Sequence, residues 1–98
     1  MYTVHTTQEF DRWLSRMRDA KGKARIVARI RSAELGNLGD TAPVGNGISE
    51  MRVHYGPGYR VYFKRRGKVL ILLLLGGSKA TQARDIQKAK ELAISIEE

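Results

Sequence analysis

Residues 50–75 read EMRVHYGPGYRVYFKRRGKVLILLLL, and this stretch decides the fold. Apolar and polar residues alternate over 50–55 and again over 59–64, which indicates two half-buried strands separated by a Gly-Pro-Gly turn. A second turn at 65–68 precedes residues 69–75, a continuous apolar run typical of a central strand that is covered on both faces. The stretch therefore predicts a three-stranded antiparallel meander.

Helical patterns flank the meander on both sides. Thr6 and Glu9 have the spacing of a capping box, with Thr6 as the cap, and an apolar residue then recurs every three or four positions through residue 17. Similar spacing predicts helices over residues 24–35 and 79–96. A short alternation over residues 2–5 predicts a strand ahead of the first helix.

Residues 36–49 show no apolar period and hold four of the ten glycines, so we expect a long loop there. The order of elements is then N-terminal strand, helical hairpin, three-stranded antiparallel meander and C-terminal helix. This order defines an α+β fold in one domain over residues 1–98. The helical hairpin must bury its apolar stripe on one face of the sheet, which leaves the other face, or part of it, open to solvent.

Charge is the most informative feature of the composition. Eighteen Lys and Arg residues against ten Asp and Glu residues give a net charge of +8. Residues 12–31 hold eight basic residues and one acid, and residues 52–68 hold six basic residues and no acid. Such blocks favour a polyanionic partner, nucleic acid above all. Two alternatives remain: solvated faces that keep a small protein in solution, and an acidic partner protein.

Other features exclude whole classes of protein. The chain has no cysteine, so it has neither a disulfide scaffold nor a thiolate metal site. Its longest apolar run has seven residues, whereas a membrane-spanning helix needs about 20. The N-terminal residues show no signal-peptide pattern. We therefore expect a cytoplasmic protein with no membrane association, no metal and no cofactor.

The polar residues of the two alternating strands form a set that could carry chemistry. Arginine and lysine hold phosphate and stabilise charge that grows on its oxygens. A carboxylate or an imidazole can take a proton from a ribose 2′-hydroxyl, which then attacks the adjacent phosphorus. Such a site cleaves RNA, not DNA, and needs no metal. The alternative interpretation is a solvated outer face that alternates in the same way. The set comprises Glu50, Arg52, His54, Arg60, Tyr62 and Lys64.

Several motifs resemble one group of proteins closely. The runs PVGNGISEMR (43–52), HYGPGYRVYF (54–63) and LLGGSK (74–79) are similar to the HigB-like addiction-module killer proteins of the RelE/ParE toxin superfamily. Thr81-Gln82 and Asp85-Ile86 match the same group, so the resemblance covers nearly the whole chain. It implies a RelE/ParE-like two-layer fold and the toxin half of a bacterial type II toxin–antitoxin system.

The resemblance also implies roles for residues. Arg60, in the run Gly-Tyr-Arg, corresponds to the superfamily's phosphate-binding arginine. Glu50, Arg52 and His54 lie on the strand that supplies lysines or a glutamate base in relatives, and Lys79 lies near a basic residue that follows the last strand. The usual activity of this branch is cleavage of messenger RNA in the ribosomal decoding site. A cognate antitoxin, usually with a helix-turn-helix domain, neutralises such toxins.

The chain departs from the pattern of these toxins in one respect. Several ribosome-dependent relatives place a tyrosine or histidine in or just before the C-terminal helix, but this chain has no aromatic residue or histidine after Phe63. Proton transfer then falls to Glu50, His54 or Tyr62, or is left largely to the ribosome.

The sequence thus predicts a toxin that acts as a ribosome-dependent, metal-independent endoribonuclease. Its partners are an antitoxin, the ribosome and messenger RNA. The alternatives are a ParE-like inhibitor of DNA gyrase that cuts no RNA, and a basic RNA-binding module without toxicity. The expected catalytic residues are Arg60, Arg52, Glu50, His54 and Lys79. The expected RNA- and ribosome-binding residues are Lys64, Arg65, Arg66, Lys68 and Tyr62, with the basic helical hairpin.

Overall fold

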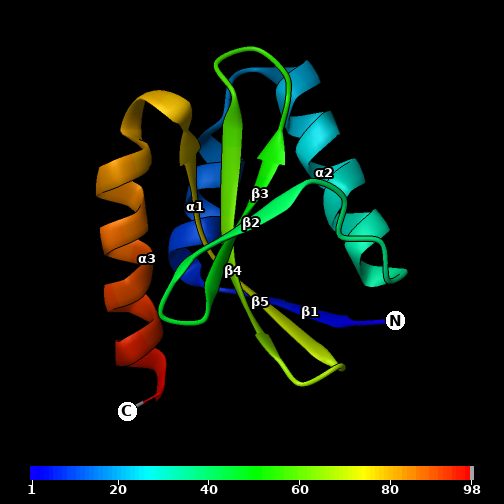
Figure 1. Cartoon of the computed structure of the whole chain (residues 1–98). Coiled ribbons are helices and arrows are strands. Elements are labelled where there is room, and N and C mark those ends of the chain that lie inside the picture. The colour runs from blue at the N-terminus through cyan, green and yellow to red at the C-terminus, as the bar shows by residue number, and fades with distance from the viewer. Residues whose placement is uncertain (98) are drawn as a thin grey trace.

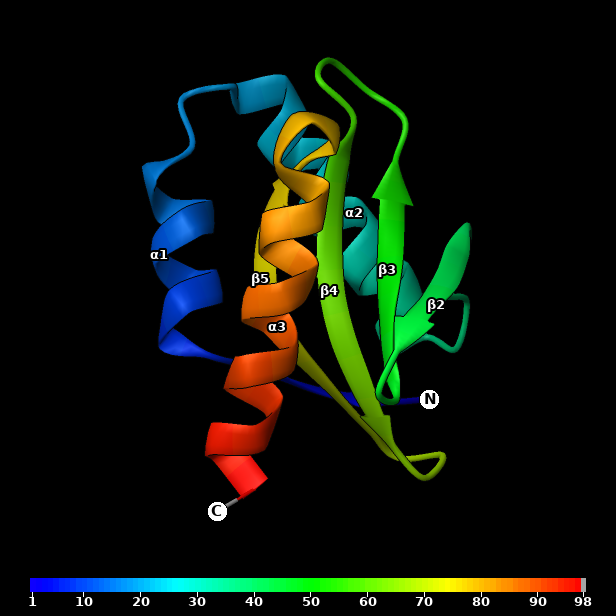
Figure 2. The same ribbon diagram turned by 60° about the vertical axis from the view of Figure 1, so that its left-hand side comes forward.

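A five-stranded sheet forms the centre of the molecule, and helices cover both of its faces (Figures 1 and 2). The computed structural model describes residues 1–97. The α+β class and the order of the predicted elements are confirmed. In chain order the elements are β1 (Thr3–Thr6), α1 (Gln8–Arg16), α2 (Ala20–Glu34), β2 (Thr41–Gly45), β3 (Ile48–Val53), β4 (Tyr59–Arg66), β5 (Leu70–Ser78), the 3₁₀ helix η1 (Lys79–Thr81) and α3 (Gln82–Glu97).

The strands lie in the order β1-β5-β4-β3-β2. β1 runs parallel to β5, and every other neighbouring pair is antiparallel. The predicted meander is β3-β4-β5, in which Arg52 lies opposite Arg60 and Glu50 lies opposite Tyr62. β5 has a strand on each side and helices over both faces, which confirms the central position that its apolar run predicts.

The prediction of a loop over residues 36–49 is wrong for the middle of this segment, which forms β2. This strand pairs with β3 across a tight turn at Asn46-Gly47, where both residues have positive φ. Asn-Gly is the residue pair that such hairpin turns favour. β2 lies at the edge of the sheet and has a neighbouring strand on one side only. Proline is tolerated on such an edge strand, because it has no N–H to donate to a second neighbour. The proline and glycines of this segment therefore led to a loop prediction where the structure has an edge strand.

β5 continues through Gly76-Gly77, where the sequence suggests that it ends. A Cβ atom on Gly76 would lie 2.2 Å from the Trp13 ring, and one on Gly77 would lie 1.9 Å from Asp85 Oδ2. The two glycines let α1 and α3 approach the strand from opposite faces. They allow close packing and do not break the strand.

The starts of both N-terminal helices also differ from the expected positions. The cap of α1 is Thr7, not Thr6: its Oγ1 accepts from Phe10 N at 3.0 Å and donates to Leu74 O at 2.6 Å. α2 begins four residues early, because Asp19 caps it by accepting from Gly22 N at 3.0 Å. A Cβ on Gly22 would meet the Tyr59 ring at 2.6 Å, so glycine at this position permits helix-to-sheet contact.

The sheet separates two cores. α1 and α2 pack on residues that include Met51, Val61 and Phe63, and α3 packs on the opposite face against residues that include Tyr62 and Leu74. α3 therefore covers part of the second face, so only the rest of that face is open, which is the narrower of the two outcomes that the sequence allowed. Within residues 1–97, no helix is both long and apolar enough to cross a membrane.

Candidate functional site

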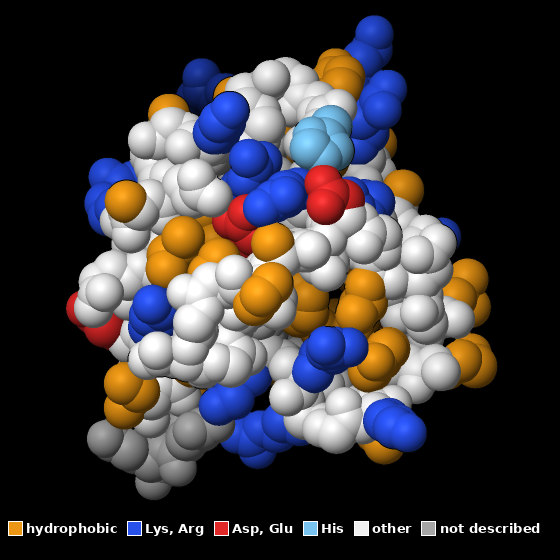
Figure 3. All heavy atoms as spheres, in the orientation of Figure 1, with side chains coloured by type: hydrophobic (Ala, Val, Ile, Leu, Met, Phe, Trp, Pro, Cys, Tyr) orange, Lys and Arg blue, Asp and Glu red, His pale blue; other side chains and the backbone are white. Residues whose placement is uncertain are grey.

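One end of the sheet, which we call the His54 end, gathers polar side chains from several elements. β3 ends there, β4 and β2 begin there, and α3 starts beside them (Figure 1). In the same orientation, Figure 3 shows a histidine with basic and acidic side chains grouped on the surface over β3 and the β3–β4 loop.

His54 and Asp40 form the most exposed pair at this end. His54 Nε2 lies 2.6 Å from Asp40 Oδ2, and the His54 side chain is 71% exposed. The hydrogen bond from His54, followed by the positive charge of Arg52, lowers the pKa of Asp40 below its usual value despite partial desolvation. An ionised carboxylate only accepts hydrogen bonds, so Nε2 of a neutral His54 carries the proton and Nδ1 keeps its lone pair. His54 is thus oriented as a proton acceptor.

Glu50, on the same strand as Arg52, is buried, with 1% of its surface exposed. Its Oε2 accepts from Arg52 Nε at 2.9 Å, and its Oε1 accepts from Gln82 Nε2 at 2.8 Å. Both carboxylate oxygens are therefore occupied. This geometry favours Glu50 as a residue that positions Arg52 and the start of α3, and it favours His54 as the base.

Two arginines lie opposite each other on β3 and β4, and both approach the Glu50 carboxylate. Arg52 is partly exposed and reaches Asp40 at 3.8 Å as well as Glu50. Arg60 is 8% exposed, and its Nε is 3.9 Å from Glu50 Oε1. Within residues 1–97, no hydrogen-bond partner reaches that Nε. A phosphate at the surface therefore meets Arg52 first, and Arg60 adds positive charge from just below.

Tyr62 departs most from the sequence-based expectation. It was expected on an open face as an RNA contact, yet it is fully buried against α3 with Leu74 and Ala89. Burial, followed by the charges of Glu50 and Asp85, raises the pKa of Tyr62 to about 12. A buried phenol with this pKa neither contacts RNA nor transfers protons near neutral pH, so this expectation is wrong. Tyr62 is buried because α3 packs on this face of the sheet.

Lys79 follows β5 directly and lies at the His54 end of the sheet. It begins η1, its N–H donates to Gly58 O at 2.8 Å, and its side chain is exposed. A Cβ built on Gly58 would lie 3.4 Å from Lys79 Cβ and 3.5 Å from Arg60 Nη1. Gly58 therefore separates the two cationic residues, and together with Arg52 they place three positive charges around this end of the sheet.

The other expected RNA contacts lie elsewhere. Arg65, Arg66 and Lys68 are exposed at the opposite end of β4, which we call the Arg65 end, and Lys64 precedes them on the strand. At about 3.3 Å per strand residue, Arg65 lies roughly 16 Å along the strand from Arg60. The structure does not bring these residues to the His54 end. They could contact only a different part of a large partner.

Sequence reasoning missed three contributors to the site. Asp40 pairs with His54, Gln82 holds Glu50, and Arg29 donates to the carbonyls of Arg52, Leu38 and Asp40. The Asn-Gly turn is the signal that could have revealed Asp40, because a β2–β3 hairpin with Thr41 opposite Met51 places Asp40 beside Arg52. The sequence singles out Gln82 only as part of the Thr81-Gln82 motif, without a role, and we find no sequence signal for Arg29.

The arrangement joins an oriented imidazole to a cluster of cations. An imidazole can take a proton from a hydroxyl, and arginines can stabilise negative charge on phosphate oxygens. Among residues 1–97, no three His, Asp or Glu side chains lie close enough to hold a metal ion. The site suits chemistry on an anionic, hydroxyl-bearing substrate.

Comparison with other proteins places the chain in a family without supplying an activity. No protein-family model matches the sequence. The chain is 49% identical over 90 residues to an uncharacterized protein of Haemophilus influenzae, and the alignment covers 92% of this chain and 91% of that protein. The chain therefore belongs to the same family as the Haemophilus protein.

Proposed function

We propose that this protein is the toxin of a bacterial toxin–antitoxin pair and that it cleaves messenger RNA on the ribosome in the cytoplasm. The observation that carries the proposal is the His54 end of the sheet. There, His54 lies 2.6 Å from Asp40, Asp40 also pairs with Arg52 at 3.8 Å, and Arg60 lies opposite Arg52 on the next strand of a chain with a net charge of +8. The resemblance to RelE/ParE toxins supports it independently.

In the proposed reaction, His54 Nδ1 takes the proton of a ribose 2′-hydroxyl. The 2′ oxygen attacks the adjacent phosphorus to form a 2′,3′-cyclic phosphate, the bond to the 5′ oxygen breaks, and that oxygen takes a proton from water. The hydroxide that remains takes the proton from the His54 imidazolium, which restores the neutral base. Arg52 holds the phosphate oxygens as negative charge grows on them, and Arg60 and Lys79 add to the positive field. DNA lacks the attacking hydroxyl and is not a substrate. No step requires a metal ion or another cofactor.

In this proposal, the ribosome supplies the proton-transfer groups that this small site lacks. The site offers one oriented proton acceptor, so the isolated protein should cut naked RNA poorly. The Arg65 end and the exposed basic residues of α1 and α2 carry further positive charge, which ribosomal RNA can neutralise. An antitoxin, usually of the helix-turn-helix type in such pairs, would cover part of the same basic surface. A neighbouring gene that encodes a small helix-turn-helix protein would support this partner.

Induced expression without the antitoxin tests the function. Growth should stop, primer extension should show new messenger ends inside translated frames, and co-expression of the antitoxin should restore growth. If growth stops while messengers stay intact and gyrase supercoiling is lost, the protein is a gyrase inhibitor. If growth is unaffected and the protein purifies alone at high yield, it is not a toxin.

A further inference from the structure

A groove of about 380 Å³ lies between α2 and the end of β3, directly beside His54. Its volume falls in the range of about 300–1,000 Å³ that is typical of small-ligand sites. Ala28 and Val53 contribute apolar surface, and Ser32 contributes a hydroxyl. Arg25, Arg29 and His54 complete the lining. The groove thus combines an apolar wall with positive charge and hydrogen-bonding groups.

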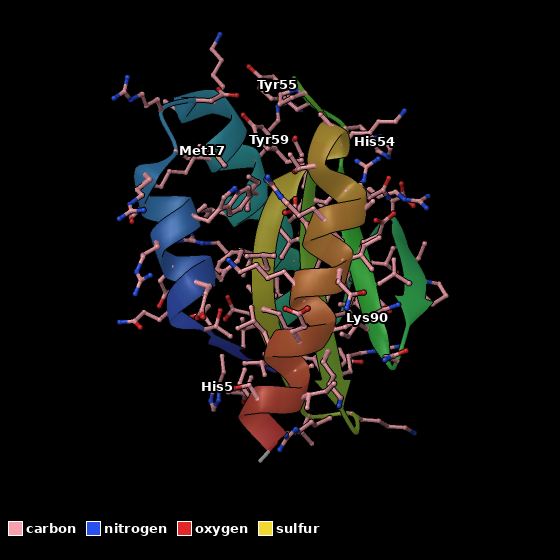
Figure 4. All side chains as sticks on the ribbon, turned by 90° about the vertical axis from the view of Figure 1, so that its left-hand side faces the viewer. His5, Met17, His54, Tyr55, Tyr59 and Lys90 are labelled. Atoms are coloured by element: carbon pink, nitrogen blue, oxygen red, sulfur yellow. The ribbon has the colours of Figure 1, made fainter. Side chains whose placement is uncertain are left out.

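A cation–π pair, which we call the platform, extends the groove toward the β3–β4 loop. The Arg25 guanidinium lies over the Tyr55 ring, 4.6 Å from its centre. Figure 4 shows Tyr55 and His54 near each other at the same end of the molecule. Unpaired RNA bases stack on aromatic rings and on guanidinium planes, and a guanidinium also attracts phosphate. The platform and the groove therefore suit the two parts of a nucleotide.

Arg29 fixes the groove relative to the candidate site. Its guanidinium donates to the carbonyls of Arg52, Leu38 and Asp40, so its charge is directed into the protein. The same contacts tie α2 to β3 and to the segment that carries Asp40. The groove wall and the Asp40–His54 pair are consequently held by one side chain, and a ligand in the groove has a defined position beside His54.

We propose that this groove holds one nucleotide of single-stranded RNA, the one next to the bond that is cleaved. The base packs against Ala28 and Val53, and Arg25 faces its phosphate. This inference rests on the proposed function, because it gives the substrate of the same site a second point of contact. It predicts that the groove contributes to the choice of cleavage position.

Filling the groove tests the inference without changing charge. Ala28→Phe places a ring in it, whereas Ala24→Phe makes the same substitution on the same helix at an exposed residue that does not line it. The probe is a hexanucleotide RNA with 2′-O-methyl sugars, which cannot be cleaved, and NMR titration gives Kd. We expect Ala28→Phe to weaken binding about 10-fold, as loss of one stacked base does, and Ala24→Phe to leave it unchanged.

A second variant tests the inference even if Ala28→Phe does not fold. Arg25→Gln removes the charge of an exposed side chain that lies over Tyr55, and it should weaken binding several-fold, with less dependence on salt. The inference is overturned if the wild-type protein does not bind the hexanucleotide, or if folded Ala28→Phe and Arg25→Gln bind it like the wild type.

Messenger cleavage separates the two proposals. If the wild type cuts messengers and Ala28→Phe both binds and cuts like it, only the groove assignment fails. If the wild type cuts nothing but Ala28→Phe loses hexanucleotide binding, the groove binds single-stranded RNA as proposed, and the ribonuclease function fails together with the position next to a cleaved bond.

Discussion

The two faces of the sheet bury different kinds of side chain. The face under α1 and α2 buries apolar residues such as Phe10, Ile26 and Phe63. The face under α3 buries Glu50 and Arg60 next to Leu74 and Tyr62. One face is an ordinary apolar core, whereas the other contains charges at the end where His54 lies.

This difference suggests that one face of the sheet contributes mainly to stability and the other mainly to function. Apolar burial stabilises a domain in proportion to the area removed from water, whereas buried charges lose hydration and often contribute little net stability. The Nε of Arg60 and the hydroxyl of Tyr62 are both buried, and no group in residues 1–97 bonds either atom. We infer that the α1/α2 face holds the fold together and that the polar part of the α3 face positions the site.

The largest effect is expected on the α1/α2 face. Phe63→Ala should lower the free energy of unfolding by about 3–5 kcal/mol, because it removes a buried ring and leaves a cavity. Urea unfolding followed by circular dichroism measures it. Val69→Ala is the control: this side chain is exposed, and its loss should cost less than about 0.5 kcal/mol. A loss below about 1 kcal/mol for Phe63→Ala would contradict the assignment of the main core.

An intermediate effect is expected at Glu50. Glu50→Gln keeps the size of the side chain but removes the charge that Arg52 and Arg60 face, so it should cost about 2 kcal/mol. Glu91→Gln, on the exposed part of α3, should cost almost nothing. Urea unfolding of both variants checks this. Equal stability of Glu50→Gln and the wild type would show that Glu50 does not hold the two arginines in place.

A smaller effect of opposite sign is expected at Tyr62. Tyr62→Phe removes a buried hydroxyl that has no bonding partner in residues 1–97, so stability should stay the same or rise by up to about 1 kcal/mol. Tyr59→Phe removes a hydroxyl that donates to Asp19 at 2.7 Å and should cost about 1 kcal/mol. Thermal unfolding distinguishes the two. A marked loss in Tyr62→Phe would mean that its hydroxyl is bonded in solution.

The smallest effect concerns pH. The pKa of Tyr62 is raised from 10.0 to about 12, so between these values the folded state keeps a proton that the unfolded state loses. Stability should therefore fall as pH rises from 10 toward 12, and the contribution of Tyr62 is about 1 kcal/mol at one unit above 10. Urea midpoints at pH 9 and pH 11 should fall less in Tyr62→Phe than in the wild type. Equal falls would contradict the burial of this phenol.

The sequence predicted the α1/α2 side of the molecule better than the α3 side. Alternation and helical spacing depend on apolar residues, and these define the α1/α2 core and the central position of β5. The same alternation placed Glu50, Arg60 and Tyr62 together on one face but could not show that α3 covers it. Whether a polar face lies against solvent or beneath a helix depends on tertiary packing, which local periodicity does not record.

The site could likewise be predicted only in part. Strand alternation placed Glu50, Arg52 and Arg60 on one face, and the register confirms that Arg52 and Arg60 are neighbours. Asp40 lies in a segment that the sequence predicts as a loop, because the strand that follows it contains Pro43 and the residues before it include two glycines. Contacts such as Gln82 with Glu50 join residues 32 positions apart, so no local pattern reveals them.

The chain's two histidines give the most direct test of the central claim, that His54 and its neighbours form an RNA-cleaving site. His54 pairs with Asp40, whereas His5 is exposed on β1. Primer extension should measure messenger cleavage on translating ribosomes by folded His54→Ala and His5→Ala proteins. We predict that His54→Ala cuts about 10²- to 10⁴-fold more slowly, as loss of a general base does, while His5→Ala cuts at the parental rate. Cleavage by His54→Ala at the parental rate would contradict the account.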